Sequence, residues 1–417
     1  MPIECTLMNK NTPVLKLKGQ NIKMAEAIKI LEPKRTCEIY FPTFFAESVS
    51  FMNKFLCPPG ITSEDADVRK KQFNTWFSKR CVSKNRAGLP EEVSVEWTGG
   101  EHPNYFSLSD QYWIKYSEDE NWADLNFFTN KFSLITGDAL FSRSTSWLDR
   151  IPLDLNTPEI TTNGILNKRW ILDNKGNPVL VKMSSKEALY ESINEVLASQ
   201  LLLKTGNIKY VPYELQIIGY NICCTCSNIV DENTELVTCA NLYNSGPRTE
   251  KENKLRECKA MVEAIKEHLD NAIEFFEIPG GKEFIRAMTA FDRKINNQDR
   301  HFANCGFLRN VNTGKYIGPA PLFDFGNAFM PKATPEKSKN FAAYEDELFA
   351  TGNMQVLDTT MFSKILDDCN LLTLEEKMDI LKMLEENNNY IIKRSVASNS
   401  NAVKDFSSKT QMSGVNF

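Results

Sequence analysis

The spacing of apolar residues changes midway along the chain, which predicts a strand-rich part followed by a helical part. The runs 169–172 and 179–182 are β-prone and flank a turn rich in Asn, Asp and Gly, so they predict a hairpin. Further short strands are expected at 213–218 and 221–229. Between these two pairs of strands, residues 186–205 follow the pair Ser184-Ser185, a candidate cap, and precede Gly206, which predicts a helix with one broad apolar face.

Helical periodicity dominates the second half of the sequence. Apolar residues recur every three or four positions from Leu255 to Ile273 and predict one long amphipathic helix that ends near 279–281. A second apolar-periodic stretch covers 284–291, and a capping box at 373–376 predicts the start of a third helix.

These patterns divide the chain into four parts and indicate an α+β fold. The predicted parts are residues 1–150, a region of unknown function; 151–235, a strand-rich unit; 236–395, a helical unit; and 396–417, a flexible tail rich in Ser and Asn. Two lobes of unlike character, with a cleft between them, are the expected architecture.

Composition narrows the class of protein without identifying it. Of the 417 residues, 42% are hydrophobic and 25% are charged, which is typical of a globular chain and excludes a disordered or collagen-like one. A net charge of −5 argues against nucleic acid as a direct partner. No apolar run is long enough to span a bilayer, and the start does not resemble an export signal, so no membrane is expected. The eleven scattered cysteines then indicate reduced thiols in the cytoplasm.

The clearest chemical pattern lies near the second predicted hairpin, 306–318. Asp299 and Asn304 precede this hairpin, five residues apart, and Asp324 follows it in the tripeptide Asp-Phe-Gly. Because a hairpin returns the chain on itself, it can bring Asp324 close to Asp299 and Asn304. Carboxylate and amide oxygens are ligands that Mg²⁺ takes, with phosphates and waters completing the octahedron.

Phosphoryl transfer needs this combination of groups. In protein kinases an Asp orients or deprotonates the attacking hydroxyl, while an Asn five residues later and a further Asp hold the metal. We therefore predict Asp299 as the catalytic base and Asn304 and Asp324 as Mg²⁺ ligands, with ATP as the phosphate donor. Each motif alone also fits a polar turn or cap, and it is the order of all of them that favours a kinase.

The other half of an ATP site is predicted upstream. Lys182 ends a predicted strand and Glu195 lies on the following helix, so the two could pair and hold the lysine against the α- and β-phosphates. Glu191 lies one helical turn earlier and could make the same pair. We predict Glu195 as the partner of Lys182, partly because of the resemblance described below.

Further candidates for contact with ATP flank this lysine and the catalytic Asp. Thr162, Asn163 and Gly164 could form a turn that covers the phosphates, with Lys168 as additional positive charge. His301 could hydrogen-bond a phosphate or brace the catalytic loop, and it could equally be a structural histidine whose hydrogen bonds are satisfied within the protein.

The order Asp-Arg-His-x-x-Asn of residues 299–304 is inverted relative to ordinary protein kinases. It resembles HipA-like kinases and phosphatidylinositol 3/4-kinases. The segments similar to the C-terminal kinase domain of bacterial HipA-like proteins are 170–182, 192–195, 210–212 and 299–325. Residues 108–114 and 126–129 also resemble the amino-terminal region of some HipA-related proteins.

The resemblance implies a bilobal protein-kinase-like fold, ATP with Mg²⁺, and transfer of phosphate to a Ser or Thr of a protein. It supports the roles given above to Asp299, Asn304, Asp324 and Lys182. Better-known HipA proteins are toxins whose antitoxin partner neutralises them and binds DNA, so a toxin–antitoxin role and a regulatory partner are implied as well. The turn at 161–164 departs from the Ser-Gly-rich phosphate loop of the family. Three alternatives stay open: a lipid kinase of the phosphatidylinositol type, a nucleotide-binding pseudokinase, and an enzyme that transfers AMP.

Overall fold

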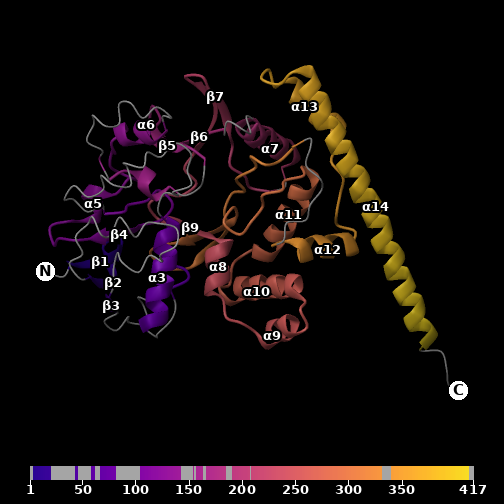
Figure 1. Cartoon of the computed structure of the whole chain (residues 1–417), viewed down its shortest axis with the longest axis horizontal. Coiled ribbons are helices and arrows are strands. Elements are labelled where there is room, and N and C mark those ends of the chain that lie inside the picture. Colours follow the sequence, from indigo (N-terminus) through magenta and orange to yellow (C-terminus); the bar gives the residue numbers. More distant parts are fainter. Residues whose placement is uncertain are drawn as a thin grey trace. The chain divides into compact units, whose positions relative to one another are not determined.

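The protein folds into two compact units with mixed helices and sheets (Figure 1). The computed structural model describes residues 3–19, 43–45, 58–61, 66–80, 104–141, 154, 156–162, 166–184, 190–206, 208–330 and 340–412. The first unit comprises Met1–Leu189, Glu214–Val237 and Phe307–Gly318, and the second comprises Tyr190–Tyr213, Thr238–Gly306 and Pro319–Phe417. The predicted α+β class is therefore confirmed.

A four-stranded antiparallel sheet forms part of the first unit. Its order is β3-β2-β1-β4, with β1 at Ile3–Asn9, β2 at Thr12–Gly19, β3 at Thr43–Phe45 and β4 at Tyr112–Lys115. Helix α3 (Ala66–Arg80) contributes Phe73, Trp76 and Phe77 to a buried cluster that also contains Leu7 of the sheet. This spacing places the three aromatic rings on one face of the helix, which explains why α3 covers the sheet.

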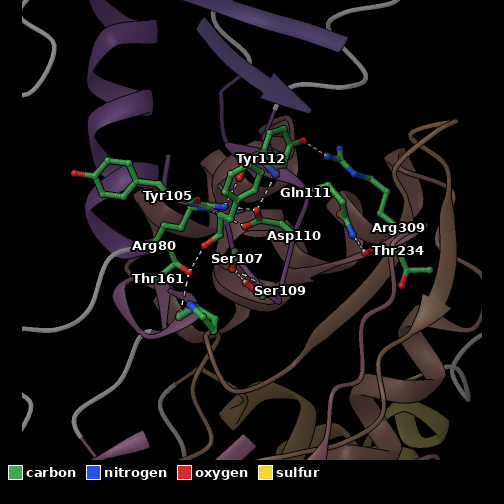
Figure 2. Close-up of polar contacts among 12 residues, drawn as sticks. Arg80, Tyr105, Ser107, Ser109, Asp110, Gln111, Tyr112, Thr161, Thr234 and Arg309 are labelled. Atoms are coloured by element: carbon green, nitrogen blue, oxygen red, sulfur yellow. Dashed lines mark hydrogen bonds and ion pairs between the residues drawn. The ribbon is translucent and has the colours of Figure 1, made fainter. Parts of the chain in front are cut away.

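A buried polar network joins α3, the segment before β4 and strand β10 (Gly306–Asn310) (Figure 2). Arg80 donates to both carboxylate oxygens of Asp110, at 3.0 and 2.6 Å. Arg309 donates to the Tyr112 hydroxyl at 2.9 Å and to a carboxylate oxygen of Glu235 at 2.5 Å. Burial raises the pKa of the Glu235 carboxyl, although the charge of Arg309 opposes this shift. These contacts tie part of the segment that resembles HipA-related proteins into the interior of the first unit.

The remaining strands of the structure confirm the predicted hairpins. Strands β5 (Lys168–Leu172), β6 (Pro178–Met183), β7 (Glu214–Ile218) and β8 (Asn221–Ser227) form an antiparallel sheet in the order β5-β6-β8-β7. A third sheet contains β9 (Thr234–Thr238), β10 and β11 (Tyr316–Pro319) in the order β11-β10-β9. In the β5–β6 hairpin, Lys168 lies directly opposite Lys182. Short helical segments also occur at α5 (Trp122–Leu125), α6 (Ile135–Phe141) and η3 (Pro158–Thr161).

The second unit is helical. Its helices are α7 (Glu191–Thr205), α8 (Cys239–Ser245), α9 (Glu250–Glu257), α10 (Met261–Phe275), α11 (Gly281–Lys294), α12 (Ala342–Ala350), α13 (Thr359–Asp367) and α14 (Leu374–Met412). Helix α7 ends as predicted at Gly206, whose positive φ of 68° is one that glycine adopts without steric cost. Its N-cap is Tyr190 rather than the predicted Ser-Ser pair.

The single long helix predicted from Leu255 to Ile273 is wrong, because the chain breaks between α9 and α10. Lys259 adopts a left-handed backbone with φ 59°, which ends the first helix. The buried pair of Glu252 on α9 and His268 on α10, 2.7 Å apart, then holds the two helices together. Of the apolar positions that suggested one helix, Leu255 is half-buried and Cys258 is exposed, whereas Leu269 and Ile273 on α10 are buried.

Helix α14 continues to Met412, so residues 396–412 are helical where the composition predicted a flexible tail. The predicted capping box starts this helix: Thr373 N–H donates to Glu376 at 2.7 Å, and Glu376 N–H donates to the Thr373 hydroxyl at 3.3 Å. Between 374 and 412 the sequence contains neither proline nor glycine, so nothing local ends the helix. Within the described residues, none of the helices combines the length and the apolar character that a membrane crossing requires.

Replacing Lys259 by glycine is expected to raise the free energy of unfolding by up to about 1 kcal/mol, because glycine adopts the left-handed backbone without strain. The same substitution at the exposed position Lys254 in α9 is expected to lower it by about 1 kcal/mol. Urea unfolding of both variants measures the two effects. A Lys259→Gly protein that loses as much stability as Lys254→Gly would show that the backbone at 259 is not a source of strain.

Candidate active site

The predicted catalytic loop starts where α11 ends, and Asp292 in the last turn of this helix organises it. The Asp292 carboxylate accepts from Asn297 Nδ2 at 2.8 Å, from Arg300 Nε at 2.8 Å and from Arg300 Nη2 at 3.2 Å. All three side chains are buried. A carboxylate that accepts several hydrogen bonds, two of them from one guanidinium, fixes the path of the chain after the helix.

Arg300 joins the catalytic loop to the segment that precedes Asp324. Its Nη1 donates to the carbonyl oxygen of Asn304 and, at 2.6 Å, to that of Phe323. The residue is 2% exposed, and its guanidinium lies 5.3 Å from the centre of the Phe325 ring. Burial lowers the pKa of Arg300, but the charge of Asp292 and its hydrogen bonds outweigh burial and raise this pKa above its usual value. One permanently charged group therefore holds the backbones of both metal-ligand candidates.

Asp324 has an unusual backbone that its neighbours hold in place. Its φ is 66°, in the left-handed region that L-residues rarely adopt. The next amide, Phe325 N–H, donates to Glu195 Oε2 at 2.8 Å, and Asn194 Nδ2 donates to the Gly326 carbonyl at 2.8 Å. Both acceptor and donor side chains come from α7. Strain of this kind concentrates at functional sites, where the surrounding structure enforces it.

Asp299 presents an exposed carboxylate next to this segment. Its Oδ2 accepts from Asn327 Nδ2 at 3.3 Å, and its carbonyl oxygen accepts from Asn304 Nδ2 at 3.1 Å. Asn327 lies three residues after Asp324, so the two predicted acidic residues lie on segments that touch. An exposed carboxylate with one oxygen oriented by an amide can accept a hydrogen bond from a substrate hydroxyl at the other oxygen.

The donor atoms present fit Mg²⁺ bound together with a nucleotide. With its nitrogen engaged by the Asp299 carbonyl, the Asn304 side chain offers an amide oxygen, and Asp324 offers a carboxylate. Among the described residues there is no group of three or more His, Cys, Asp or Glu that could hold a metal ion by itself. Mg²⁺ commonly takes one or two oxygen ligands from protein and completes its shell with phosphates and waters, so the Asn304 and Asp324 side chains would be chemically suitable ligands.

His301 forms hydrogen bonds within its own loop. Its ring Nδ1 accepts from Ala303 N–H at 3.2 Å, and its carbonyl oxygen accepts from Asn304 N–H at 2.9 Å. The side chain is exposed. These contacts fit a brace of the catalytic loop or a structural histidine, and the phosphate contact stays a prediction.

Of the other predicted ATP-binding residues, Lys182, Lys168 and the turn at 162–164 belong to the first unit, whereas Glu195 lies on α7 in the second. Lys182 on β6 is 5% exposed and faces the same side of the sheet as Lys168 on β5. The Thr162 hydroxyl donates to the Pro158 carbonyl at 2.7 Å and accepts from Trp170 Nε1 at 3.0 Å, so it stabilises the end of η3. Asn163 and Gly164 lie outside the described residues. Pairing of Lys182 with Glu195 stays a prediction.

Three residues of the second unit shape the site although the sequence pattern assigned them no role. They are Asn194, Asp292 and Asn327. Asn194 could have been noticed as the neighbour of Glu195. Asp292 and Asn327 carry no local signal, since their contacts are with residues of other segments.

Comparison with known proteins supports a kinase-like protein. No family model matches the chain. The serine/threonine-protein kinase CtkA of Helicobacter pylori is 33% identical over 129 residues, which are 31% of this chain and 38% of that protein. The chain therefore matches well under half the length of this curated relative. The match is to a protein named as a serine/threonine kinase and bears out the predicted resemblance to kinases of that class.

Two solved structures are also similar to the chain at low identity. The crystal structure of the H. pylori proinflammatory kinase CtkA gives a TM-score of 0.39 at 19% identity, covering 57% of this chain and 92% of that one. HipA of Shewanella oneidensis MR-1, in a complex with HipB and operator DNA, gives a TM-score of 0.48 at 11% identity, covering 94% of this chain and 99% of that one.

Arg300→Ala is expected to lower the free energy of unfolding by about 3–5 kcal/mol, because it leaves the buried Asp292 charge without its partner. The control is Arg286→Ala on the same helix as Asp292, since Arg286 and its partner Glu347 are partly exposed and their pair contributes about 1 kcal/mol or less. Urea unfolding measures both. Equal losses for the two variants would contradict the organising role of Arg300.

Proposed function

We propose that the protein is a HipA-like kinase that transfers the γ-phosphate of Mg-ATP to a Ser or Thr of a protein. The observation that carries this proposal lies within the second unit. Arg300 donates to the carbonyl oxygens of Asn304 and Phe323, so a loop with a base candidate and a segment with a metal-ligand candidate meet at one buried cation. The match to a named serine/threonine-protein kinase adds independent support.

In this proposal Asp299 is the catalytic base. Its exposed carboxylate orients the acceptor hydroxyl and takes its proton as the phosphate is transferred, while Asn327 holds the other carboxylate oxygen. Asn304 and Asp324 hold Mg²⁺, which, when bound, offsets negative charge on the transferring phosphates. His301 keeps Asn304 in place through its carbonyl oxygen.

Lys182 and Lys168 supply positive charge for the phosphates. The two lysines lie directly opposite each other on antiparallel strands, so they share one face of the β5–β6 hairpin. Two positive charges on one face support a phosphate site there. We propose Glu195 as the acidic partner of Lys182 and the turn that contains Thr162, Asn163 and Gly164 as the cover of the phosphates.

The biological setting follows from the resemblance to HipA-like kinases. We propose a cytoplasmic toxin whose regulatory partner is an antitoxin-type protein. The net charge of −5 is consistent with a chain that contacts nucleic acid through such a partner rather than directly.

Incubation with γ-labelled ATP, Mg²⁺ and a cell lysate is expected to label the protein itself or a lysate protein. Asp299→Asn should lower the labelling rate by about 100- to 10,000-fold, because it removes the base and keeps the size of the side chain. Asp324→Ala should abolish Mg²⁺-dependent labelling. Asp379→Asn, an exposed change on α14, serves as the control and should label at the wild-type rate.

Other outcomes of the same assay contradict the proposal and identify the alternative. Label in an organic-phase lipid would indicate a lipid kinase, and label from α-labelled ATP would indicate transfer of AMP. Binding of ATP in a calorimeter without any transfer would indicate a pseudokinase.

A further inference from the structure

Helix α7 presents two adjacent buried polar side chains to the segment that contains Asp324. Asn194 is 1% exposed and Glu195 is 2% exposed. A polar group so deeply buried is unfavourable unless it forms hydrogen bonds. The two side chains form hydrogen bonds with two consecutive residues of the segment. Glu195 Oε2 accepts from Phe325 N–H at 2.8 Å, and Asn194 Nδ2 donates to the Gly326 carbonyl at 2.8 Å.

These two bonds act on the peptide groups that directly follow Asp324. The left-handed backbone of Asp324 is less favourable than an extended or helical one, so the residue would relax if the following peptides were released. The Phe325 ring is fully buried, with its centroid 5.8 Å from that of Phe291. The ring therefore anchors the segment on one side, and α7 holds its backbone on the other.

Helix α7 packs against this segment at van der Waals distance. A Cβ added to Gly326 would lie 3.4 Å from Glu191 Cβ, one helical turn before Glu195, which is an ordinary packing distance. Asn194 Nδ2 also lies 3.7 Å from Met330 Sδ, further along the same segment. The helix therefore lies next to the segment at Gly326 and at Met330.

We propose that Asn194 is a positioning residue which, together with Glu195, forms a clamp on Phe325 and Gly326 and so holds Asp324 in the conformation that binds metal and nucleotide. The part of this inference that concerns metal binding rests on the proposed kinase function. The clamp itself is a property of the unliganded protein. It gives Glu195 a role at Asp324 through one carboxylate oxygen, in addition to the role predicted for it with Lys182.

The chemistry of the Asn194 bond allows a selective test. Asn194→Asp keeps the size of the side chain but turns a carboxylate oxygen toward the Gly326 carbonyl, which repels it. Asn194→Ala removes the bond without adding charge. The control is Asn388 on α14 in the second unit, which donates to the Leu357 carbonyl at 2.8 Å and accepts from Leu357 N–H at 2.9 Å. Asn388→Ala removes hydrogen bonds that involve neither α11 nor the segment that contains Asp324.

Hydrogen exchange of the unliganded proteins tests the clamp. Asn194→Ala and Asn194→Asp are expected to speed exchange of the Phe325 amide by about fivefold to tenfold, the effect of losing one hydrogen bond, whereas Asn388→Ala should leave it at the wild-type rate. Wild-type exchange at Phe325 in both Asn194 variants would overturn the clamp. This readout does not depend on catalysis, so it separates failure of the clamp from failure of the kinase proposal.

Binding of Mn²⁺ in the presence of a non-hydrolysable ATP analogue tests the positioning role. Asn194→Ala is expected to raise the Mn²⁺ Kd by about fivefold to tenfold, because part of the binding energy is then used to restore the backbone of Asp324. Affinity for the analogue without metal should not change. Faster exchange at Phe325 with an unchanged Mn²⁺ Kd would overturn the role of Asn194 in metal binding.

Discussion

The arrangement of the candidate site depends on one buried guanidinium, that of Arg300, which needs hydrogen-bond acceptors on several sides. Arg300 is removed from water, and a charge in that position is stable only where hydrogen bonds replace its hydration. The acceptors are the Asp292 carboxylate and the carbonyls of Asn304 and Phe323. They surround the guanidinium only when the catalytic loop and the Asp324 segment lie side by side. The hydrogen bonds that solvate the Arg300 guanidinium therefore set the positions of the proposed metal ligands.

The left-handed backbone of Asp324 persists because rigid elements hold the neighbouring residues from several directions. Arg300 binds the residue before Asp324, α7 binds the two residues after it, and the buried Phe325 ring anchors the segment in the core. Functional groups held by packed secondary structure keep their orientation without rearrangement during the reaction, which is the arrangement that electrostatic catalysis requires. In the proposed mechanism the exposed Asp299 contacts the substrate, and the buried residues around it hold the loop in position.

The sequence predicted those features that depend on local pattern. The two hairpins and the capping box at Thr373 follow from turn residues and side-chain chemistry within a few positions, and the structure confirms them. The break at Lys259 escaped prediction because apolar periodicity continues across it. The base and metal-ligand candidates could be chosen because kinase chemistry demands those residue types at that spacing. The roles of Arg300, Asp292 and Asn194 could not, since each depends on a contact between segments distant in sequence.

A crystal structure with Mn²⁺ and a non-hydrolysable ATP analogue would test the central claim most directly, since anomalous scattering locates the metal. The account predicts a metal peak within about 2.5 Å of the Asp324 carboxylate and the Asn304 amide oxygen, with Arg300 still bonded to the carbonyls of Asn304 and Phe323. A metal bound elsewhere on the chain, or an Asp324 side chain turned away from it, would contradict the account.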